Sequence, residues 1–175
     1  KTTKIKLAET EAAAKLTGVF EKFVPKEFMN RIAPEGLENL IFGHAESDFV
    51  TILFSDIRAF TEISENLSPQ ELMDFLNGYL REMNPPIMEH QGFVDKFIGD
   101  AIMAVFDQPD KTNADEAENA LDAALGMQKV LVQLNEKRKK LKLDPVSIGI
   151  GIHSGNVIIG TVGFEERMDS TVLGD

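Results

Sequence analysis

The sequence predicts an α/β sandwich, in which one mixed, mainly antiparallel sheet packs against helices behind a helical N-terminal lead-in. Two observations support this fold class. Long segments with apolar residues every three or four positions alternate with short β-branched runs, and two of those runs are separated by only two turn-forming residues. The chain has 175 residues, 43% hydrophobic and 27% charged, as is typical of one soluble domain with a modest appendage.

Residues 1–45 predict the helical lead-in. Apolar side chains recur every three or four positions as far as Phe23, and Pro25 is expected to end this amphipathic helix. A short second helix is expected over Phe28–Ile32. Two interpretations stay open for the lead-in: it connects the domain to an upstream regulatory module, or it is a packing helix of the same domain.

The first strand and the first long helix come next. Residues Phe49–Phe54 are apolar without interruption and include β-branched side chains, which predicts a strand buried on both faces. Ser68 and Glu71 form a capping-box pattern at the start of a long helical segment, with a proline in its first turn. Pro85-Pro86 is expected to end or kink this helix, although a further turn through Glu89 stays open.

A tight hairpin is predicted in the middle of the chain. The runs Gly92–Ile98 and Ala101–Phe106 both read as strands, and only Gly99-Asp100 separates them. A second long helix is expected from about Ala117 to Leu134.

The basic run Lys137–Lys140 closes that helix and is expected to be a solvated helix end that complements the helix dipole. Val146–Ile152 and Val157–Val162 are then predicted as two strands on either side of a turn at Ser154-Gly155. The resulting order, β-α-β-β-α-β-β, indicates a ferredoxin-like α/β sandwich.

The net charge of −11 excludes one large class of function, because a protein that holds nucleic acid through a basic surface is not expected to be this acidic. A phosphate-bearing ligand would need concentrated positive charge, and a divalent cation held by carboxylates is the obvious source. The chain has no cysteine, which excludes disulfides, thiolate nucleophiles and cysteine-based zinc sites. No apolar run reaches the ~18 residues of a membrane span.

Two carboxylates occupy unusual positions. Asp56 ends a strand that otherwise admits only apolar residues, and Asp100 lies at the tip of the hairpin. If the strand and the hairpin are neighbours in the sheet, the two side chains could meet at one edge and hold Mg²⁺ or Mn²⁺ together with substrate phosphates. The alternative stays open that Asp56 caps the following turn and that Asp100 is the aspartate favoured in hairpins.

Other candidate binding groups surround these carboxylates. The backbone N–H groups of Ile57-Arg58-Ala59-Phe60-Thr61 could cradle phosphate oxygens, although this stretch lacks the glycines of a P-loop. Lys96 could donate a hydrogen bond to a base or a phosphate, or could instead extend to water. With only three histidines in the chain, a histidine metal site or a Ser-His-Asp system has no support, and His153 is expected to stabilise a turn.

Four motifs, in order and spacing, carry a family resemblance. They are Phe54–Thr61, Val94–Ala101, Gly151–Gly155 and Thr171–Asp175. Together they resemble the catalytic domain of class III nucleotidyl cyclases of the bacterial type. The resemblance implies a catalytic domain over residues 46–175, and residues 1–45 are similar to the segment that joins such domains to upstream sensory or membrane modules.

The resemblance also implies roles for individual residues. Asp56 and Asp100 match the two metal-binding aspartates, with the Ile57 carbonyl as a further ligand for two Mg²⁺ or Mn²⁺ ions, and the backbone of residues 58–61 matches the segment that holds the triphosphate. Lys96 and Thr171 match the pair that reads the purine, and both residue types favour ATP. A threonine at the position of Thr171 also marks a subgroup of the family in which stimulation by bicarbonate has been proposed.

The implied function is an adenylyl cyclase that converts ATP to cyclic AMP and pyrophosphate. The resemblance implies a homodimer in which the aspartates of one copy face Lys96 and Thr171 of the other. Two alternatives stay open: a guanylyl cyclase, and an inactive nucleotide-binding dimerisation module. The catalytic domain is expected to lie in the cytoplasm, even if the parent protein is attached to a membrane.

The chain departs from the family pattern in two places. The transition-state asparagine and arginine of the family lie several residues beyond Thr171, past the last residue of this sequence, so the chain as given is expected to be inactive or nearly so. Many relatives also carry a phosphate-binding arginine shortly before the Gly-Ile-His motif, where this chain reads Ser147-Ile148-Gly149-Ile150. Phosphate binding there is expected to use other groups.

Overall fold

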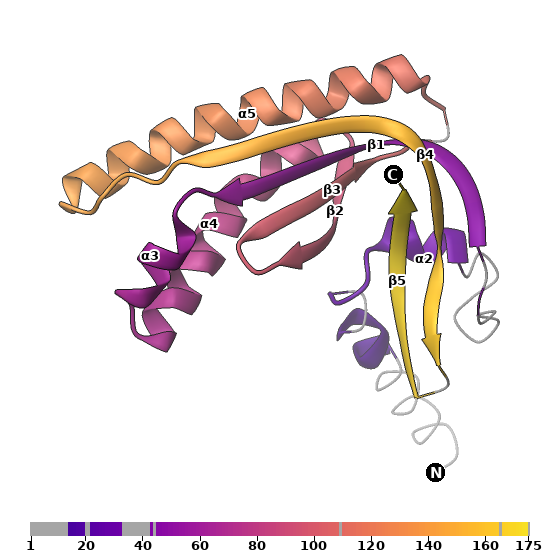
Figure 1. The fold of residues 1–175 in the computed structure, drawn as a ribbon, viewed down its shortest axis with the longest axis horizontal. Helices are drawn as coiled ribbons and strands as arrows, with labels where there is room; N and C mark the ends of the chain where they lie inside the picture. Colours follow the sequence, from indigo (N-terminus) through magenta and orange to yellow (C-terminus); the bar gives the residue numbers. More distant parts are fainter. Residues whose placement is uncertain are drawn as a thin grey trace, which may run out of the picture. The chain divides into compact units, whose positions relative to one another are not determined.

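A computed structural model of the chain describes residues 14–19, 22–32, 43, 45–108, 110–164 and 166–174 (Figure 1). Its elements are α2 (Lys26–Ile32), β1 (Ala45–Ile57), α3 (Phe60–Glu65), α4 (Pro69–Glu89), β2 (Gly92–Ile98), β3 (Ala101–Phe106), α5 (Asn113–Lys140), β4 (Ile148–Phe164) and β5 (Arg167–Gly174). The chain divides into a larger unit, Ser47–Val157 with Gly174–Asp175, and a smaller unit, Lys1–Glu46 with Ile158–Leu173. Among the described residues, no helix is both long and apolar enough to cross a membrane.

The sheet has the strand order β2-β3-β1-β4-β5. Strand β3 pairs antiparallel with β1, where Leu53 lies opposite Ala104, and antiparallel with β2 on its other side. The hairpin between β2 and β3 turns at Gly99-Asp100 as predicted, and Gly99 adopts a φ of 62°, which glycine reaches at no steric cost. The order β2-β3-β1-β4 is that of a ferredoxin-like sandwich, which confirms the predicted fold class.

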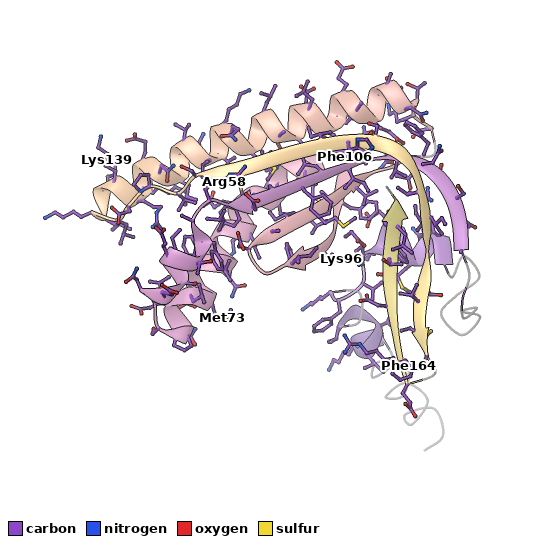
Figure 2. The ribbon with its side chains drawn as sticks, viewed as in Figure 1. Arg58, Met73, Lys96, Phe106, Lys139 and Phe164 are labelled. Carbon is purple, nitrogen blue, oxygen red and sulfur yellow. The ribbon has the colours of Figure 1, made fainter. Side chains whose placement is uncertain are left out.

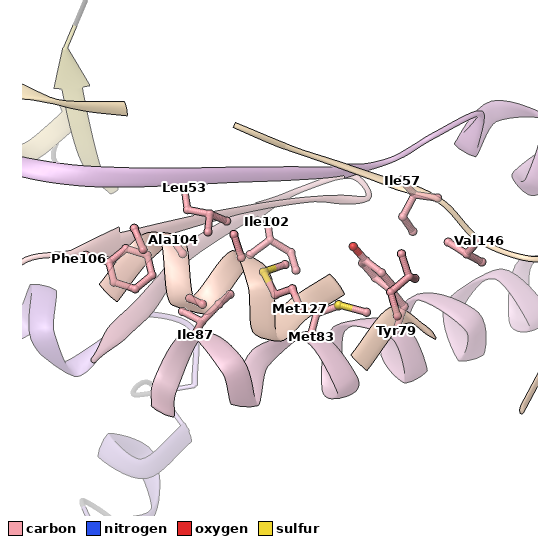
Figure 3. Close-up of a cluster of buried hydrophobic side chains, with 14 residues drawn as sticks. Leu53, Ile57, Tyr79, Met83, Ile87, Ile102, Ala104, Phe106, Met127 and Val146 are labelled. Carbon is pink, nitrogen blue, oxygen red and sulfur yellow. The ribbon is translucent and has the colours of Figure 1, made fainter. Parts of the chain in front are cut away.

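The core of the larger unit lies between one face of the sheet and the helices α4 and α5 (Figure 3). Alternate residues of the strands point to this face, and the helices contribute side chains spaced by three or four positions. The fully buried members include Leu53, Ile102 and Phe106 from the strands, Met83 and Ile87 from α4, and Met127 from α5. Each such side chain contributes roughly 1.5–3 kcal/mol through burial.

Helix α4 begins with the predicted capping box. The Ser68 side chain accepts a hydrogen bond from the Glu71 N–H. The Glu71 carboxylate accepts hydrogen bonds from the Ser68 hydroxyl at 2.6 Å and from the Ser68 N–H at 2.9 Å, which together hold the pKa of Glu71 below its usual value. The helix continues through Pro85 and Pro86 to Glu89, which is the alternative that the sequence left open. Pro86 is buried where Gly126 of α5 allows close approach, so helix packing compensates for the lost hydrogen bonds.

The C-terminal strands differ from the prediction. We expected a turn at Ser154-Gly155, but β4 runs without a break from Ile148 to Phe164, and the Ser154 hydroxyl hydrogen-bonds to the buried Thr51 hydroxyl of β1 at 2.7 Å. His153 therefore lies in a strand and stabilises no turn there. Within β4, the glycine with a positive φ is Gly163 at the strand's end, where a side chain would collide with the backbone of Arg167. Strand β5, which follows, was not predicted.

The smaller unit contains the described part of the lead-in. Residues 14–19 are helical, in agreement with the predicted amphipathic helix, and its residues 1–13 and 20–21 lie outside the described part of the chain. The helix was also expected to reach Phe23, but Lys22 and Phe23 form a turn. Helix α2 confirms the predicted second helix, and its Phe28 is buried. The same unit contains the second half of β4, where the Thr161 hydroxyl accepts a hydrogen bond from the Gly43 N–H at 3.2 Å.

Candidate functional site

The two candidate metal ligands come from neighbouring strands of the larger unit. The register of β1 and β3 pairs Ser55 with Ile102, so Ile57 comes opposite Asp100 at the end of the sheet. There the Ile57 N–H donates a hydrogen bond of 2.8 Å to the Asp100 carboxylate, which fixes that side chain. Asp56 lies between the buried residues Ser55 and Ile57 and is exposed, because alternate residues of a strand point to opposite faces. The structure thus brings Asp56, Ile57 and Asp100 to one end of the sheet.

A buried tyrosine lies near both aspartates. Tyr79 of α4 is 1% exposed, and neither its hydroxyl nor that of the buried Ser55 makes a hydrogen bond of good geometry to another described residue. Burial is the main cause that raises the pKa of Tyr79 to about 12; the Ser55 hydroxyl opposes the rise, and the carboxylates of Asp100 and Asp56 add to it. The two carboxylates therefore act on the same phenol.

The shifted pKa of Tyr79 makes a prediction about stability. A phenol that titrates near 10 in the unfolded chain and near 12 in the folded protein contributes stability that is complete below pH 10 and is lost as the pH rises to 12. We expect wild type to lose about 2–3 kcal/mol more than Tyr79→Phe over this range. Urea unfolding of both proteins between pH 9 and 12 measures the difference, and parallel pH profiles would contradict the burial of a protonated phenol.

The donor set at this sheet end suits a hard divalent cation. The predicted ligands are two carboxylates and the backbone carbonyl of Ile57, and Mg²⁺ commonly completes such a set with water and substrate phosphates. The described residues contain no group of three or more His, Asp or Glu side chains able to hold a metal by themselves. A metal here would therefore depend on oxygen ligands from the substrate as well as on Asp56 and Asp100.

The segment after Asp56 turns sharply into a short helix. Ala59 adopts the left-handed conformation, with φ 55° and ψ 33°, and precedes α3. This conformation is uncommon outside glycine, and such residues are found at functional sites. The Arg58 N–H donates to the Ser147 carbonyl at 2.8 Å, so the backbone N–H groups that remain for a phosphate in this segment belong to Ala59, Phe60 and Thr61.

A β-bulge turns Lys96 to the face of the sheet opposite the helices. Val94 pairs with Ala104, but the next pair is Lys96 with Met103, so Asp95 is an extra residue in β2. Val94 packs on the helix-facing core, and without the bulge Lys96 would point to the same side. Because paired residues share a face, the bulge places Lys96 with Met103 on the opposite side. There Met103 is also paired with the exposed Phe54 of β1.

The bulge residue itself contacts the lysine. The side chain of Asp95 is fully buried, and its carboxylate lies 3.5 Å from the Lys96 ammonium, whose side chain is 31% exposed. A buried carboxylate is costly unless a cation accompanies it, so Asp95 restricts where the lysine can lie. Thr171, the other predicted purine-reading residue, lies in β5 of the smaller unit.

Sequence reasoning missed Tyr79, Asp95 and Gly149 as residues of this region. Tyr79 occupies a position in the apolar face of α4 that reads as ordinary core, although a lone tyrosine in such a face could have been noticed. The carboxylate of Asp95 in an otherwise apolar strand was the visible signal of the bulge. Nothing in the sequence marked Gly149, which lies next to the side chain of Arg58 from the turn after β1.

Comparison with known proteins gives the family. The model for the adenylate and guanylate cyclase catalytic domain matches residues 42–173. The chain belongs to the class III nucleotidyl cyclases. An adenylate cyclase of Anabaena cylindrica is 49% identical over 160 residues, which are 89% of this chain and 31% of that protein. The chain thus spans about a third of the length of this curated relative.

Solved structures of cyclases are similar to the chain. A bacterial light-regulated adenylyl cyclase superposes with a TM-score of 0.80 at 28% identity, over 98% of this chain and 49% of that one. The guanylyl cyclase Cya2 superposes with a TM-score of 0.66 at 38% identity, over 74% of this chain and 66% of that one. These cyclase structures therefore include enzymes named for either nucleotide.

Proposed function

We propose that this cyclase domain is an adenylyl cyclase, which converts ATP to 3′,5′-cyclic AMP and pyrophosphate. The observation that carries the choice of nucleotide is Lys96, which the β-bulge turns away from the core beside Met103. Adenine presents an unprotonated N1 as a hydrogen-bond acceptor, whereas guanine presents an N1–H donor. A lysine ammonium has only donors and suits adenine, and an acidic residue suits guanine.

The residues at the sheet end have separate tasks in this reaction. Asp56, Asp100 and the Ile57 carbonyl would hold Mg²⁺ or Mn²⁺, which when bound supply a lowered pKa for the ribose 3′-hydroxyl and positive charge for the phosphates. The Ile57 N–H keeps the Asp100 carboxylate oriented through its 2.8 Å hydrogen bond. The N–H groups of Ala59, Phe60 and Thr61 would bind phosphate oxygens. The 3′-oxygen then attacks the α-phosphorus, and pyrophosphate leaves.

The proposed assembly is a homodimer, with the aspartates of one copy and Lys96 and Thr171 of the other at each site. Its support in this chain is the apolar side chains on the Lys96 face of the sheet, where Phe54 and Ile98 are about half exposed. Exposed aromatic and aliphatic side chains next to a polar site are typical of an interface. An upstream module in the parent protein, joined through residues 1–45, is part of the same proposal.

A guanylyl cyclase is the second candidate, since the guanylyl cyclase Cya2 is 38% identical to the chain. One experiment distinguishes the candidates and tests the proposal. The full-length protein is incubated with Mn²⁺ and either ATP or GTP, and the cyclic product is identified by mass spectrometry. We expect cyclic AMP from ATP at a rate well above that of cyclic GTP from GTP. A faster reaction with GTP would favour the second candidate, and neither product would indicate an inactive nucleotide-binding module.

A further inference from the structure

Gly149 of β4 supports a neighbouring arginine. A Cβ atom built on Gly149 would overlap the guanidinium of Arg58, so any side chain at position 149 would displace that group. The Gly149 backbone has no positive φ, so its conformation alone does not require glycine. The glycine instead leaves room for the guanidinium close to the backbone of β4.

The backbone on both sides holds this contact in register. The Arg58 N–H donates to the Ser147 carbonyl at 2.8 Å, which ties the end of β1 to the start of β4 two residues before Gly149. Figure 2 shows Arg58 at this end of β1, beside β4. This hydrogen bond fixes the backbone of Arg58, from which the side chain reaches the surface of β4 at Gly149.

The guanidinium also lies beside the proposed metal ligands. Its Nη1 is 3.5 Å from the Asp56 carboxylate, and the side chains of Arg58 and Asp56 are 65% and 52% exposed. An ion pair this long and this exposed is weak. A guanidinium carries five N–H donors in a planar fork, so donors remain for a further anion.

The distribution of charge also favours an anionic ligand. The stretch Ser147-Ile148-Gly149-Ile150 contains no cationic side chain, and the chain as a whole carries −11. Arg58 therefore brings to this part of β4 a positive charge that β4 itself does not supply. A planar donor fork two residues from Asp56 matches the paired oxygens of a phosphate group.

We propose that Arg58, seated on Gly149, binds a phosphate group of the nucleotide triphosphate through its guanidinium. The inference rests on the proposed function and adds to it a side-chain contact that depends on the glycine. Gly149 is a positioning residue in this proposal, because it acts only through the arginine. The proposal predicts that a methyl group at position 149 weakens phosphate binding, as removal of the Arg58 side chain does.

The test uses four variants of the full-length protein. Gly149→Ala displaces the guanidinium, and Arg58→Ala removes it. Arg58→Lys keeps the positive charge but lacks the planar pair of N–H donors that a guanidinium offers to a phosphate. Gly151→Ala is the matched control, because it adds the same methyl group to the same strand where no atom lies within 4 Å. Isothermal titration calorimetry with inorganic tripolyphosphate measures binding without catalysis, and the KM and kcat for ATP are measured in parallel.

We expect tripolyphosphate to bind Gly149→Ala and Arg58→Ala about 10- to 100-fold more weakly than wild type, with Arg58→Lys in between. Gly151→Ala should bind as wild type does. In the Arg58→Ala background, Gly149→Ala should have no further effect, because the group that it displaces is gone. The KM for ATP should rise in the same order as the dissociation constant.

Two results would overturn the inference: tripolyphosphate affinity unchanged in Arg58→Ala, or additive effects of the two substitutions. Arg58→Ala decides the question even if Gly149→Ala fails to fold, because the arginine side chain is largely exposed. The experiments distinguish failure of the proposed cyclase activity from failure of the proposed phosphate contact. Weakened tripolyphosphate binding in a protein that forms no cyclic AMP would reject the enzyme and keep the phosphate contact, and unchanged binding in an active enzyme would do the reverse.

Discussion

Asp100→Ala is expected to lower the rate of cyclic AMP formation by on the order of 10³-fold or more, because it removes a ligand from the proposed metal site. The Asp100 carboxylate accepts the Ile57 N–H at 2.8 Å, so its loss also releases the end of β1. The measurement is the initial rate of cyclic AMP formation by the full-length protein at saturating ATP and Mn²⁺.

Two further variants separate chemistry from folding. Asp100→Asn retains the volume and an oxygen that can accept the Ile57 N–H, but it removes the negative charge that a metal requires, so it should fold as wild type does and remain nearly inactive. Asp122→Ala removes an exposed aspartate from α5 and should leave the rate unchanged. An Asp100→Asn protein with wild-type activity would contradict the metal assignment.

Lys96→Glu is expected to change the ratio of kcat/KM for ATP to that for GTP by about 10²-fold or more, since a site built to hydrogen-bond one partner strongly rejects another. An acidic side chain accepts from the guanine N1–H and repels the acceptor of adenine. Lys96→Met is the control, because it should lose ATP turnover without gaining GTP turnover. The ratio is obtained from initial rates with both nucleotides.

The ion pair with Asp95 affects this experiment. The Asp95 carboxylate is fully buried 3.5 Å from the Lys96 ammonium, so Lys96→Glu places a second negative charge next to it and should lower stability. Combining Lys96→Glu with Asp95→Asn removes that repulsion. We expect the double variant to unfold at a higher urea concentration than Lys96→Glu and to show the same change in nucleotide preference. An unchanged preference in a stable double variant would contradict the role of Lys96.

The helices and the hairpin could be predicted because their signals are local. Ser68 with Glu71 marks a helix start, and Gly99-Asp100 between two apolar runs marks a turn, whatever the rest of the chain does. The C-terminal strands were misread for the same reason. Ser154-Gly155 has turn composition, but its conformation is decided by pairing with β1, where Ser154 meets Thr51. Tertiary pairing of this kind leaves no local pattern.

In the candidate site, too, some features have local sequence signals and others depend on the tertiary fold. Asp56 and Asp100 could be selected as polar residues at strand ends, and their convergence depended on β1 and β3 being neighbours, which the structure confirms. The orientation of Lys96 could not be predicted, because a bulge at Asp95 reverses the alternation that a strand pattern assumes. The contact between Arg58 and Gly149 joins positions 91 residues apart and also depends on the fold.

The central claim is an adenylyl cyclase site shared between two copies of the chain, and mixing two inactive variants tests it most directly. Full-length Asp100→Ala and Lys96→Met are assayed for cyclic AMP alone and after mixing under conditions that allow subunits to exchange. Half of the dimers in an equal mixture are mixed, and each has one intact site, so we predict recovery of about a quarter of wild-type activity. A mixture no more active than the two variants measured separately would contradict the shared site.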